Sequence, residues 1–195
     1  MIRLDRRTDA LGLVDIQPTF MPGGELPVPD GDAVVPVAAR LAGLFANVFA
    51  TQDWHPADHS SFASRHPGRA AYDTIDMPYG PQILWPDHGV AGTPNAALHA
   101  GLPQAAIQMV LRKGTNRDLD SYSAFFENDR ATPTGLDGWL RQRGVRRLFL
   151  CGLATDFCVA WSAEDAARLG YAVVVVEDAC RGIGIPTAPG RTTID

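Results

Sequence analysis

The sequence predicts an α/β fold in which a mostly parallel, doubly wound sheet lies between two layers of helices. Short apolar runs rich in β-branched residues recur along the chain, and segments with helical periodicity separate them. This alternation is typical of a three-layer architecture with about five to six strands and helices on both faces of the sheet. A length of 195 residues suits a single domain, which we expect to span residues 1–195.

The expected strands are short and continuous, at residues 10–16, 47–53, 106–113, 147–152 and 172–178. In the last of them, the uninterrupted run from Val173 to Val176 indicates a strand that is buried on both faces. Residues 33–45, 135–143 and 156–169 have the periodicity of helices, and Gly170 follows the third of them as a C-terminal cap.

Two segments depart from the simple alternation. Residues 54–92 are too rich in Pro, Gly and His for regular structure to be expected. A loop of this length inside a compact domain usually carries function, so we expect it to contribute to a site. The second departure follows the fifth strand, where the sequence stops at Asp195 without a further helix and strand.

Composition and charge exclude several classes of function. The net charge is -5, and no run of Lys or Arg could follow a nucleic-acid backbone or an anionic membrane. The N-terminus lacks the apolar core of a secretion signal, and no stretch has the length of a membrane span. Three cysteines at spacings that match no disulfide scaffold fit a reducing cytoplasm. The sequence leaves open whether the chain forms a homo-oligomer.

Cys158 is the first candidate for chemistry. Residues 147–160 predict a buried strand, a tight turn at Gly152 and a helix capped by Thr155 or Asp156, with Cys158 in the first helical turn. The free N–H groups and the dipole there favour a thiolate, and the same N–H groups suit the negative oxygen of a tetrahedral intermediate. The alternative is a small, inert core residue, which is how we interpret Cys151 and Cys180.

A thiol nucleophile needs a base and usually a positive neighbour. In an open α/β sheet these groups come from the carboxyl ends of other strands. Asp15 closes the first apolar run, and Lys113 closes the third. Each alone could be a turn former or a solvated charge, but their occurrence at the same predicted edge of the sheet favours a shared site.

The loop contains a candidate metal site. Asp53 and His55 lie two residues apart, so their side chains share one face of an extended backbone, and His88 completes the set when the loop folds back. One carboxylate and two imidazoles suit Zn, Fe(II) or Mn. His59 is a weaker fourth candidate. The alternative is that loop histidines are simply solvated, as we expect for the two others, His66 and His99.

These residues lie in motifs that cover nearly the whole chain. They are Val14-Asp15-Ile16-Gln17 with Phe20, Gln52-Asp53-Trp54-His55-Pro56 with Ser61-Phe62, Trp85-Pro86-Asp87-His88, Lys113-Gly114, and residues 120–126, 152–159 and 178–182. With these motifs the chain resembles the bacterial nicotinamidases, within the isochorismatase-like hydrolase superfamily. Members of that family normally continue with another helix and strand beyond the position of Asp195.

The resemblance implies an activity and a role for each matching residue. It implies hydrolysis of nicotinamide, and also of pyrazinamide, to the acid and ammonia through a cysteine thioester, for NAD salvage in the cytoplasm. It implies one divalent metal ion, with zinc as the first choice, and a cis peptide before Ala154. The implied roles are a catalytic triad of Asp15, Lys113 and Cys158, an oxyanion hole at Ala154 and Cys158, ring contacts from Phe20 and Trp85, and metal ligands Asp53, His55 and His88.

Three other functions stay open from the residues. The chain could be a cysteine amidohydrolase that acts on another small amide, such as an N-carbamoyl compound. It could use a metal-bound hydroxide, with Cys158 as a structural residue. It could also be a non-catalytic module that binds a metal or senses redox state. Phe20, Trp85 and the metal set favour an aromatic N-heterocycle as the substrate.

Overall fold

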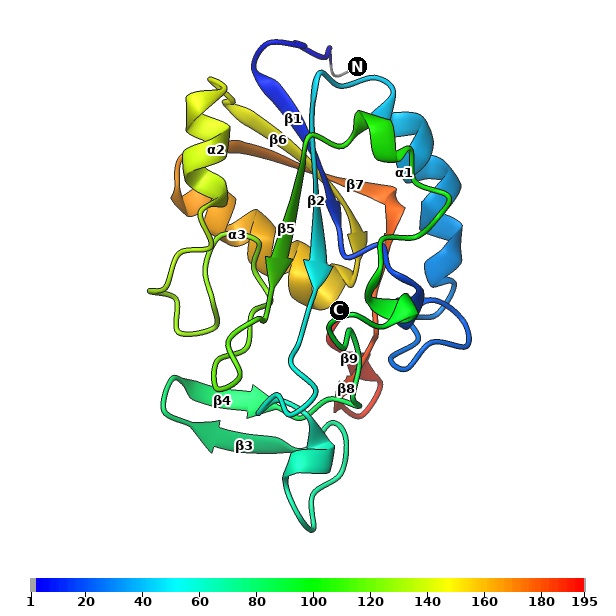
Figure 1. The fold of residues 1–195 in the computed structure, drawn as a ribbon, viewed down its shortest axis with the longest axis vertical. Coiled ribbons are helices and arrows are strands. Elements are labelled where there is room, and N and C mark those ends of the chain that lie inside the picture. The colour runs from blue at the N-terminus through cyan, green and yellow to red at the C-terminus, as the bar shows by residue number, and fades with distance from the viewer. Residues whose placement is uncertain (1–2, 195) are drawn as a thin grey trace.

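A five-stranded parallel sheet forms the centre of the computed structural model, which describes residues 3–194 (Figure 1). Its strand order is β5-β2-β1-β6-β7, and every neighbouring pair is parallel. The predicted α/β, doubly wound architecture is therefore confirmed. The strands are β1 (Asp9–Val14), β2 (Asn47–Asp53), β5 (Met109–Lys113), β6 (Arg147–Leu153) and β7 (Ala172–Arg181).

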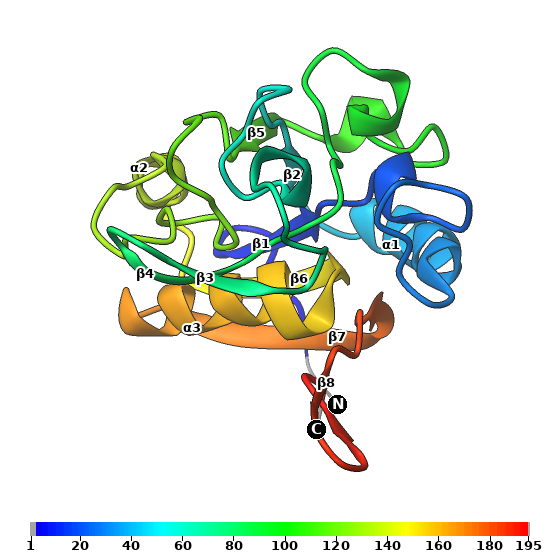
Figure 2. The same ribbon diagram turned by 90° about the horizontal axis from the view of Figure 1, so that it is seen from below.

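Helices cover both faces of this sheet. They are α1 (Val34–Ala42), α2 (Leu136–Gln142) and α3 (Ala160–Arg168). From β1 the chain passes through α1 to β2, toward the β5 edge of the sheet, and it later passes through α2 to β6 and through α3 to β7, toward the other edge. Right-handed crossovers in these two directions place α1 on one face of the sheet and α2 and α3 on the opposite face (Figure 2). Within residues 3–194, none of the helices has the length and apolar content that a bilayer-spanning segment needs.

The inner strands form the core. Every residue of β1 and β2 is buried. A Cβ atom on Gly12 would lie 2.5 Å from Cζ of Phe49. Glycine at this position in β1 therefore lets the Phe49 ring of β2 lie directly against the neighbouring backbone. This close packing fixes the two strands whose carboxyl ends carry Asp15 and Asp53.

The third predicted helix begins differently from the prediction. A π-helical turn, Thr155–Val159, follows β6 and continues directly into α3. Neither Thr155 nor Asp156 caps it, because the residue before the turn is Ala154. The carboxylate of Asp156 instead accepts the backbone N–H groups of Ile183 and Gly184, at 3.0 and 2.9 Å. The predicted cap is wrong, and Asp156 holds the segment that follows β7.

The long loop contains more regular structure than we predicted. Strands β3 (Thr74–Met77) and β4 (Gly80–Ile83) form an antiparallel hairpin that lies beyond the carboxyl ends of the main sheet (Figure 1). Pro78 follows β3, and Gly80 has a φ of 117°, so this pair of residues supports a tight turn. The same Pro and Gly content that indicated an irregular loop therefore closes a hairpin.

Short elements complete the fold. Five 3-10 turns occupy Pro18–Phe20, Gly31–Ala33, Ala63–Arg65, Pro94–Ala96 and Gln104–Ala106. After β7, strands β8 (Pro186–Ala188) and β9 (Arg191–Thr192) form a second small hairpin.

The predicted burial of β7 on both faces is wrong. Val173, Val174 and Val176 are only half-buried, and Val175 is 41% exposed. The reason is the position of β7, which pairs with β6 on one side and forms the edge of the sheet among residues 3–194. A continuous apolar run does not distinguish a central strand from an apolar edge strand.

Candidate active site

Four strands deliver polar side chains to one edge of the sheet. Asp15 directly follows β1, Asp53 ends β2, Lys113 ends β5, and Cys158 lies in the turn after β6. The strands are parallel, so their carboxyl ends meet. One side-chain atom each from Asp15, Asp53 and Cys158 lies within 4.8 Å of the others. The structure thus brings together the predicted nucleophile, base and positive neighbour.

Lys113 is the centre of this cluster. Its ammonium is fully buried and lies 2.9 Å from Asp15 Oδ2 and 3.4 Å from Cys158 Sγ. It also donates hydrogen bonds to Asp53 Oδ1 and, at 3.0 Å, to the carbonyl of Ser121. One buried cation therefore balances two buried carboxylates and also contacts the sulfur, an arrangement that compensates for the cost of burying each charge.

Thr51 orients the carboxylate of Asp15. The hydroxyl of Thr51 donates to Asp15 Oδ1 at 2.6 Å and accepts the backbone N–H of Asp15 at 3.0 Å. Asp15 Oδ2 is buried and forms an ion pair with the Lys113 ammonium at 2.9 Å. A buried carboxylate oxygen with a free lone pair beside a thiol is suited to accept a proton.

Burial determines the protonation of the cluster. Burial raises the pKa of the Cys158 thiol well above its usual value, although Lys113 opposes this shift. Burial also raises the pKa of Asp15, again against the effect of Lys113. Burial alone would lower the pKa of Lys113, but Asp15 and Asp53 hold it well above its usual value. The ammonium is therefore charged, and the thiol needs a base despite its place in the first helical turn.

The predicted metal ligands also meet at this edge. Asp53 Oδ2 lies 3.6 Å from His55 Nε2 and 3.5 Å from His88 Nε2, and all three side chains are buried. In each ring the other nitrogen, Nδ1, faces a backbone carbonyl: Gly114 O at 3.0 Å for His55 and Pro86 O at 2.8 Å for His88. The two Nε2 atoms are thus directed toward one carboxylate oxygen. Metal-binding histidines commonly pair one ring nitrogen with a backbone carbonyl in this way and leave the other nitrogen for the metal.

The local backbone supports this set. A Cβ atom on Gly114 would lie 2.3 Å from the His55 ring, and Gly114 has a φ of 64°, so glycine is needed for the ring to approach. His55 Nε2 is buried and has no hydrogen-bond partner among residues 3–194. An orphaned imidazole nitrogen in a buried Asp–His set fits a divalent metal ion.

His59, the weaker fourth candidate ligand from the sequence, lies close to this set. It is completely buried; its Nδ1 lies 2.8 Å from Ser61 Oγ, and its Nε2 has no partner within residues 3–194. With His55 and Asp120 it forms a second group whose ligand atoms lie within 4.8 Å of one another. The two remaining histidines, His66 and His99, make local hydrogen bonds and do not line the pocket.

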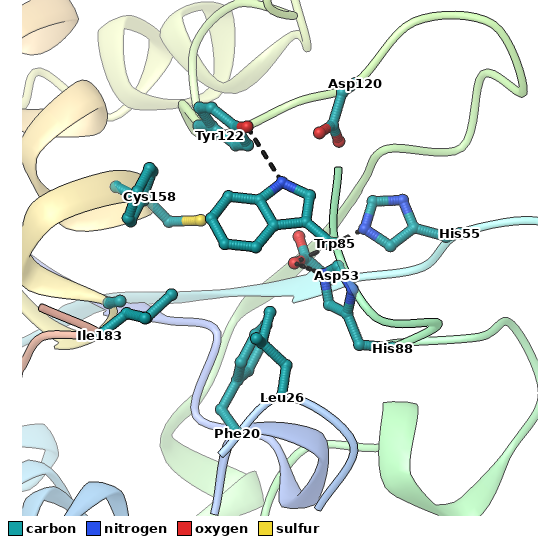
Figure 3. Close-up of a pocket in the computed structure, with 12 residues that line it drawn as sticks. Phe20, Leu26, Asp53, His55, Trp85, His88, Asp120, Tyr122, Cys158 and Ile183 are labelled. Carbon is teal, nitrogen blue, oxygen red and sulfur yellow. Dashed lines mark hydrogen bonds and ion pairs between the residues drawn. The ribbon is translucent and has the colours of Figure 1, made fainter. Parts of the chain in front are cut away.

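A small pocket adjoins the cluster. In the view of Figure 3, Cys158 lies at one end and His55 and His88 at the other, with the Trp85 and Phe20 rings between them. The predicted residues Asp53 and Ala154 also line the pocket. Five further lining residues were not predicted as site residues: Leu26, Asp120, Tyr122, Phe157 and Ile183. The mainly aromatic and apolar lining suits a flat ring with few polar atoms.

The backbone before Cys158 has the predicted geometry. The peptide bond between Leu153 and Ala154 is cis, as the resemblance implied. Cys151 and Cys180 are free and buried within β6 and β7, outside the pocket that Cys158 lines. Burial raises the pKa of the Cys180 thiol to about 11. Their burial away from the pocket agrees with a structural role.

Comparison with known proteins identifies the class. An isochorismatase domain model matches residues 9–185. The chain therefore belongs to the isochorismatase family. It is 50% identical over 174 residues to a nicotinamidase of Acinetobacter baylyi, an alignment that covers 89% of this chain and 81% of the relative.

Solved structures show the same similarity. The Acinetobacter baumanii nicotinamidase has a TM-score of 0.90 at 49% identity and covers 92% of this chain and 86% of its own. PnC1 from L. infantum, solved in complex with nicotinate, has a TM-score of 0.82 at 40% identity and covers 94% and 86%. The pyrazinamidase of Pyrococcus horikoshii, solved in complex with zinc, has a TM-score of 0.73 at 38% identity and covers 91% and 88%.

Proposed function

We propose that this protein is a nicotinamidase, an amidohydrolase that converts nicotinamide to nicotinate and ammonia. The observation that carries the proposal is the buried cluster of Asp15, Lys113 and Cys158, which opens into an aromatic pocket with an Asp–His set at its other end. The similarity to nicotinamidases at about half of the aligned positions supports the same activity.

The cluster is suited to nucleophilic catalysis. Asp15 accepts the proton of the Cys158 thiol, and the sulfur attacks the carboxamide carbon to give a tetrahedral intermediate. The backbone N–H groups of Ala154 and Cys158 stabilise its negative oxygen. Asp15 then protonates the departing ammonia, and a thioester remains. Asp15 next takes a proton from a water molecule, whose oxygen attacks the thioester carbon. The carbon–sulfur bond then breaks, nicotinate leaves, and Asp15 returns the proton to the Cys158 sulfur. Lys113 stabilises the negative charge on Asp15 and on the sulfur at each stage.

Binding of the ring involves the other side of the pocket. Phe20 and Trp85 hold the faces and edge of the pyridine ring. Asp53, His55 and His88 would hold one divalent metal ion, for which we propose zinc before Fe(II) or Mn, because the donor set suits all three. Such an ion would act as a Lewis acid toward the ring nitrogen and so orient the substrate. The shape of the pocket also suits pyrazinamide.

The product indicates a physiological role. Nicotinate from nicotinamide serves NAD salvage, and we place the enzyme in the cytoplasm on the basis of its three free cysteines.

The test is a comparison of substrates with purified, metal-analysed protein. Ammonia release is measured with nicotinamide, pyrazinamide and an N-carbamoyl amino acid, each before and after treatment with a chelator. We expect turnover of nicotinamide and pyrazinamide that is lost on chelation. Preference for the N-carbamoyl compound would indicate a different amidohydrolase, and a folded, metal-loaded protein with no activity on any amide would contradict the proposal.

A further inference from the structure

The hairpin outside the main sheet reaches the pocket through one side chain, that of Gln82 on β4. Gln82 is only 1% exposed, although the other residues of β4 are half-buried or exposed. Its side chain does not line the pocket, yet it contacts two residues that do, Asp120 and Tyr122. A buried amide with this many partners holds its neighbours in fixed positions.

The pocket wall depends on one hydrogen bond between aromatic side chains. The indole N–H of Trp85 donates to the hydroxyl oxygen of Tyr122 at 3.0 Å, as Figure 3 shows. The two rings meet edge to face, with centroids 6.1 Å apart, and both also pack edge to face against Phe157. Ring packing alone allows an aromatic side chain to shift in its plane, whereas the hydrogen bond fixes the side-chain torsions of Trp85 and so the orientation of its indole ring.

Gln82 fixes the acceptor of that bond. Its side-chain Nε2 lies within hydrogen-bond distance of three acceptors, the Ile83 carbonyl oxygen at 2.7 Å, Asp120 Oδ2 at 2.8 Å and the Tyr122 hydroxyl oxygen at 3.0 Å, and its two N–H groups are shared among them. The Tyr122 oxygen therefore accepts two hydrogen bonds, one from Trp85 and one from Gln82, which occupy both of its lone pairs. With both directions of approach defined, the oxygen has one position that satisfies its two donors.

The amide of Gln82 is itself oriented from the opposite side. Its Oε1 accepts hydrogen bonds from Asn128 Nδ2 and from the Tyr79 hydroxyl, each at 3.2 Å. Asn128 Oδ1 in turn accepts the backbone N–H of Tyr122 at 2.9 Å. The oxygen and nitrogen of the Gln82 amide thus have distinct partners, and a flipped amide would place a donor against donors.

We propose that Gln82 is a positioning residue that, through the Tyr122 hydroxyl, holds the Trp85 ring in the orientation that receives a planar aromatic amide. The inference rests on the proposed function for the identity of that amide. Gln82 touches neither the nucleophile nor the metal set, so its effect falls on ring binding and not on the chemical step. It also gives the β3–β4 hairpin a role, which is to carry this amide to the back of the pocket wall.

The test uses Gln82→Met, Tyr122→Phe and the double variant, with nicotinamide as the substrate. Methionine keeps the length of the side chain and removes its polar atoms. Gln82→Met removes every hydrogen bond of the side-chain amide, but only the bond to Tyr122 acts on the Trp85 ring. Loss of that bond raises KM about threefold to tenfold, with kcat within about twofold of wild type. Because both substitutions break the same connection, the double variant has the KM of Tyr122→Phe and not the product of the two effects.

The control is Gln108→Met, at a more exposed glutamine. Gln108 also makes two backbone hydrogen bonds, to Val48 N at 2.6 Å and Ala46 O at 3.0 Å, but it lies at the other end of β2. We expect its loss to lower stability while KM stays unchanged. If Gln108→Met raises KM as much as Gln82→Met, the effect is general destabilisation and the inference is overturned. Multiplicative effects of Gln82→Met and Tyr122→Phe would also overturn it.

A readout without substrate separates this inference from the proposed function. The indole N–H resonance of Trp85, assigned by its absence in Trp85→Phe, is followed by proton–nitrogen NMR. We expect it to move in Tyr122→Phe and in Gln82→Met and to stay in place in Gln108→Met. An unmoved resonance in Gln82→Met overturns the positioning role, whereas wild-type protein that fails to hydrolyse nicotinamide contradicts only the function. If Gln82→Met does not fold, an unmoved resonance in Tyr122→Phe overturns the inference.

Discussion

Replacing Thr51 by valine tests the role of Asp15 as the base. The side chains are nearly the same size, and the residue is completely buried. The substitution removes the hydrogen bond that the hydroxyl accepts from the backbone N–H of Asp15 and the 2.6 Å hydrogen bond that it donates to Asp15 Oδ1. The second bond stabilises the charged carboxylate and lowers the pKa of Asp15 against the raising effect of burial. Its removal therefore raises that pKa further.

The size of the shift follows from the strength of the bond. A hydrogen bond to a charged group contributes about 1.5–3 kcal/mol, and about 1.4 kcal/mol corresponds to one pKa unit. We therefore expect an increase of about one to two units. A protonated Asp15 cannot accept the thiol proton, so activity is lost as the pH falls through this pKa, and the acid limb of kcat/KM moves to higher pH by the same amount.

The assay is ammonia release from nicotinamide as a function of pH, for wild type and Thr51→Val. The control is Thr134→Val, which removes a hydroxyl bonded to the carbonyl of Ala124 at 2.6 Å, outside the pocket. We expect the acid limb to move in Thr51→Val alone. An acid limb that stays in place, or moves to lower pH, would refute the assignment of Asp15 as the base.

Three further predictions concern stability and metal binding. Lys113→Met leaves two buried carboxylates without their cation and lowers the free energy of unfolding by about 3–5 kcal/mol in denaturant titration at neutral pH; an unchanged midpoint would contradict the buried ion pairs. His55→Ala lowers the metal content of purified protein, and its melting temperature no longer responds to a chelator; full metal occupancy would exclude His55 as a ligand. Leu148→Ala in the core of β6 lowers the free energy of unfolding by about 2–5 kcal/mol but leaves KM for nicotinamide unchanged, and a raised KM would show that the core and the pocket are coupled.

The sequence contained enough information to locate the main cluster. Asp15, Lys113 and Cys158 each stand next to an apolar run, and parallel strands necessarily bring their carboxyl ends together. Asp53 and His55 share a face through the twofold repeat of extended chain. Local pattern and sheet topology are enough to place these residues, which is why the structure agrees with the prediction.

Other features depended on contacts between segments far apart in the sequence. Three partners of Gln82, namely Asp120, Tyr122 and Asn128, lie 38 to 46 residues away, and nothing in its local pattern marks it as buried. Leu26 and Ile183 line the pocket from segments outside the predicted helices and strands. The protonation of Cys158 was also misjudged, because the effect of the helix end is visible in sequence whereas the larger effect of burial is not.

The most direct test of the central claim is nicotinamide turnover by Cys158→Ala, with metal content and folding measured on the same sample. The Cys158 side chain accepts a hydrogen bond from Lys113 and does not belong to the Asp53, His55 and His88 set, so the variant should bind metal as wild type does. We predict that ammonia release falls to the uncatalysed rate while metal content and melting behaviour stay close to wild type. Retained turnover in this folded, metal-loaded variant would contradict the account and show that another group attacks the amide.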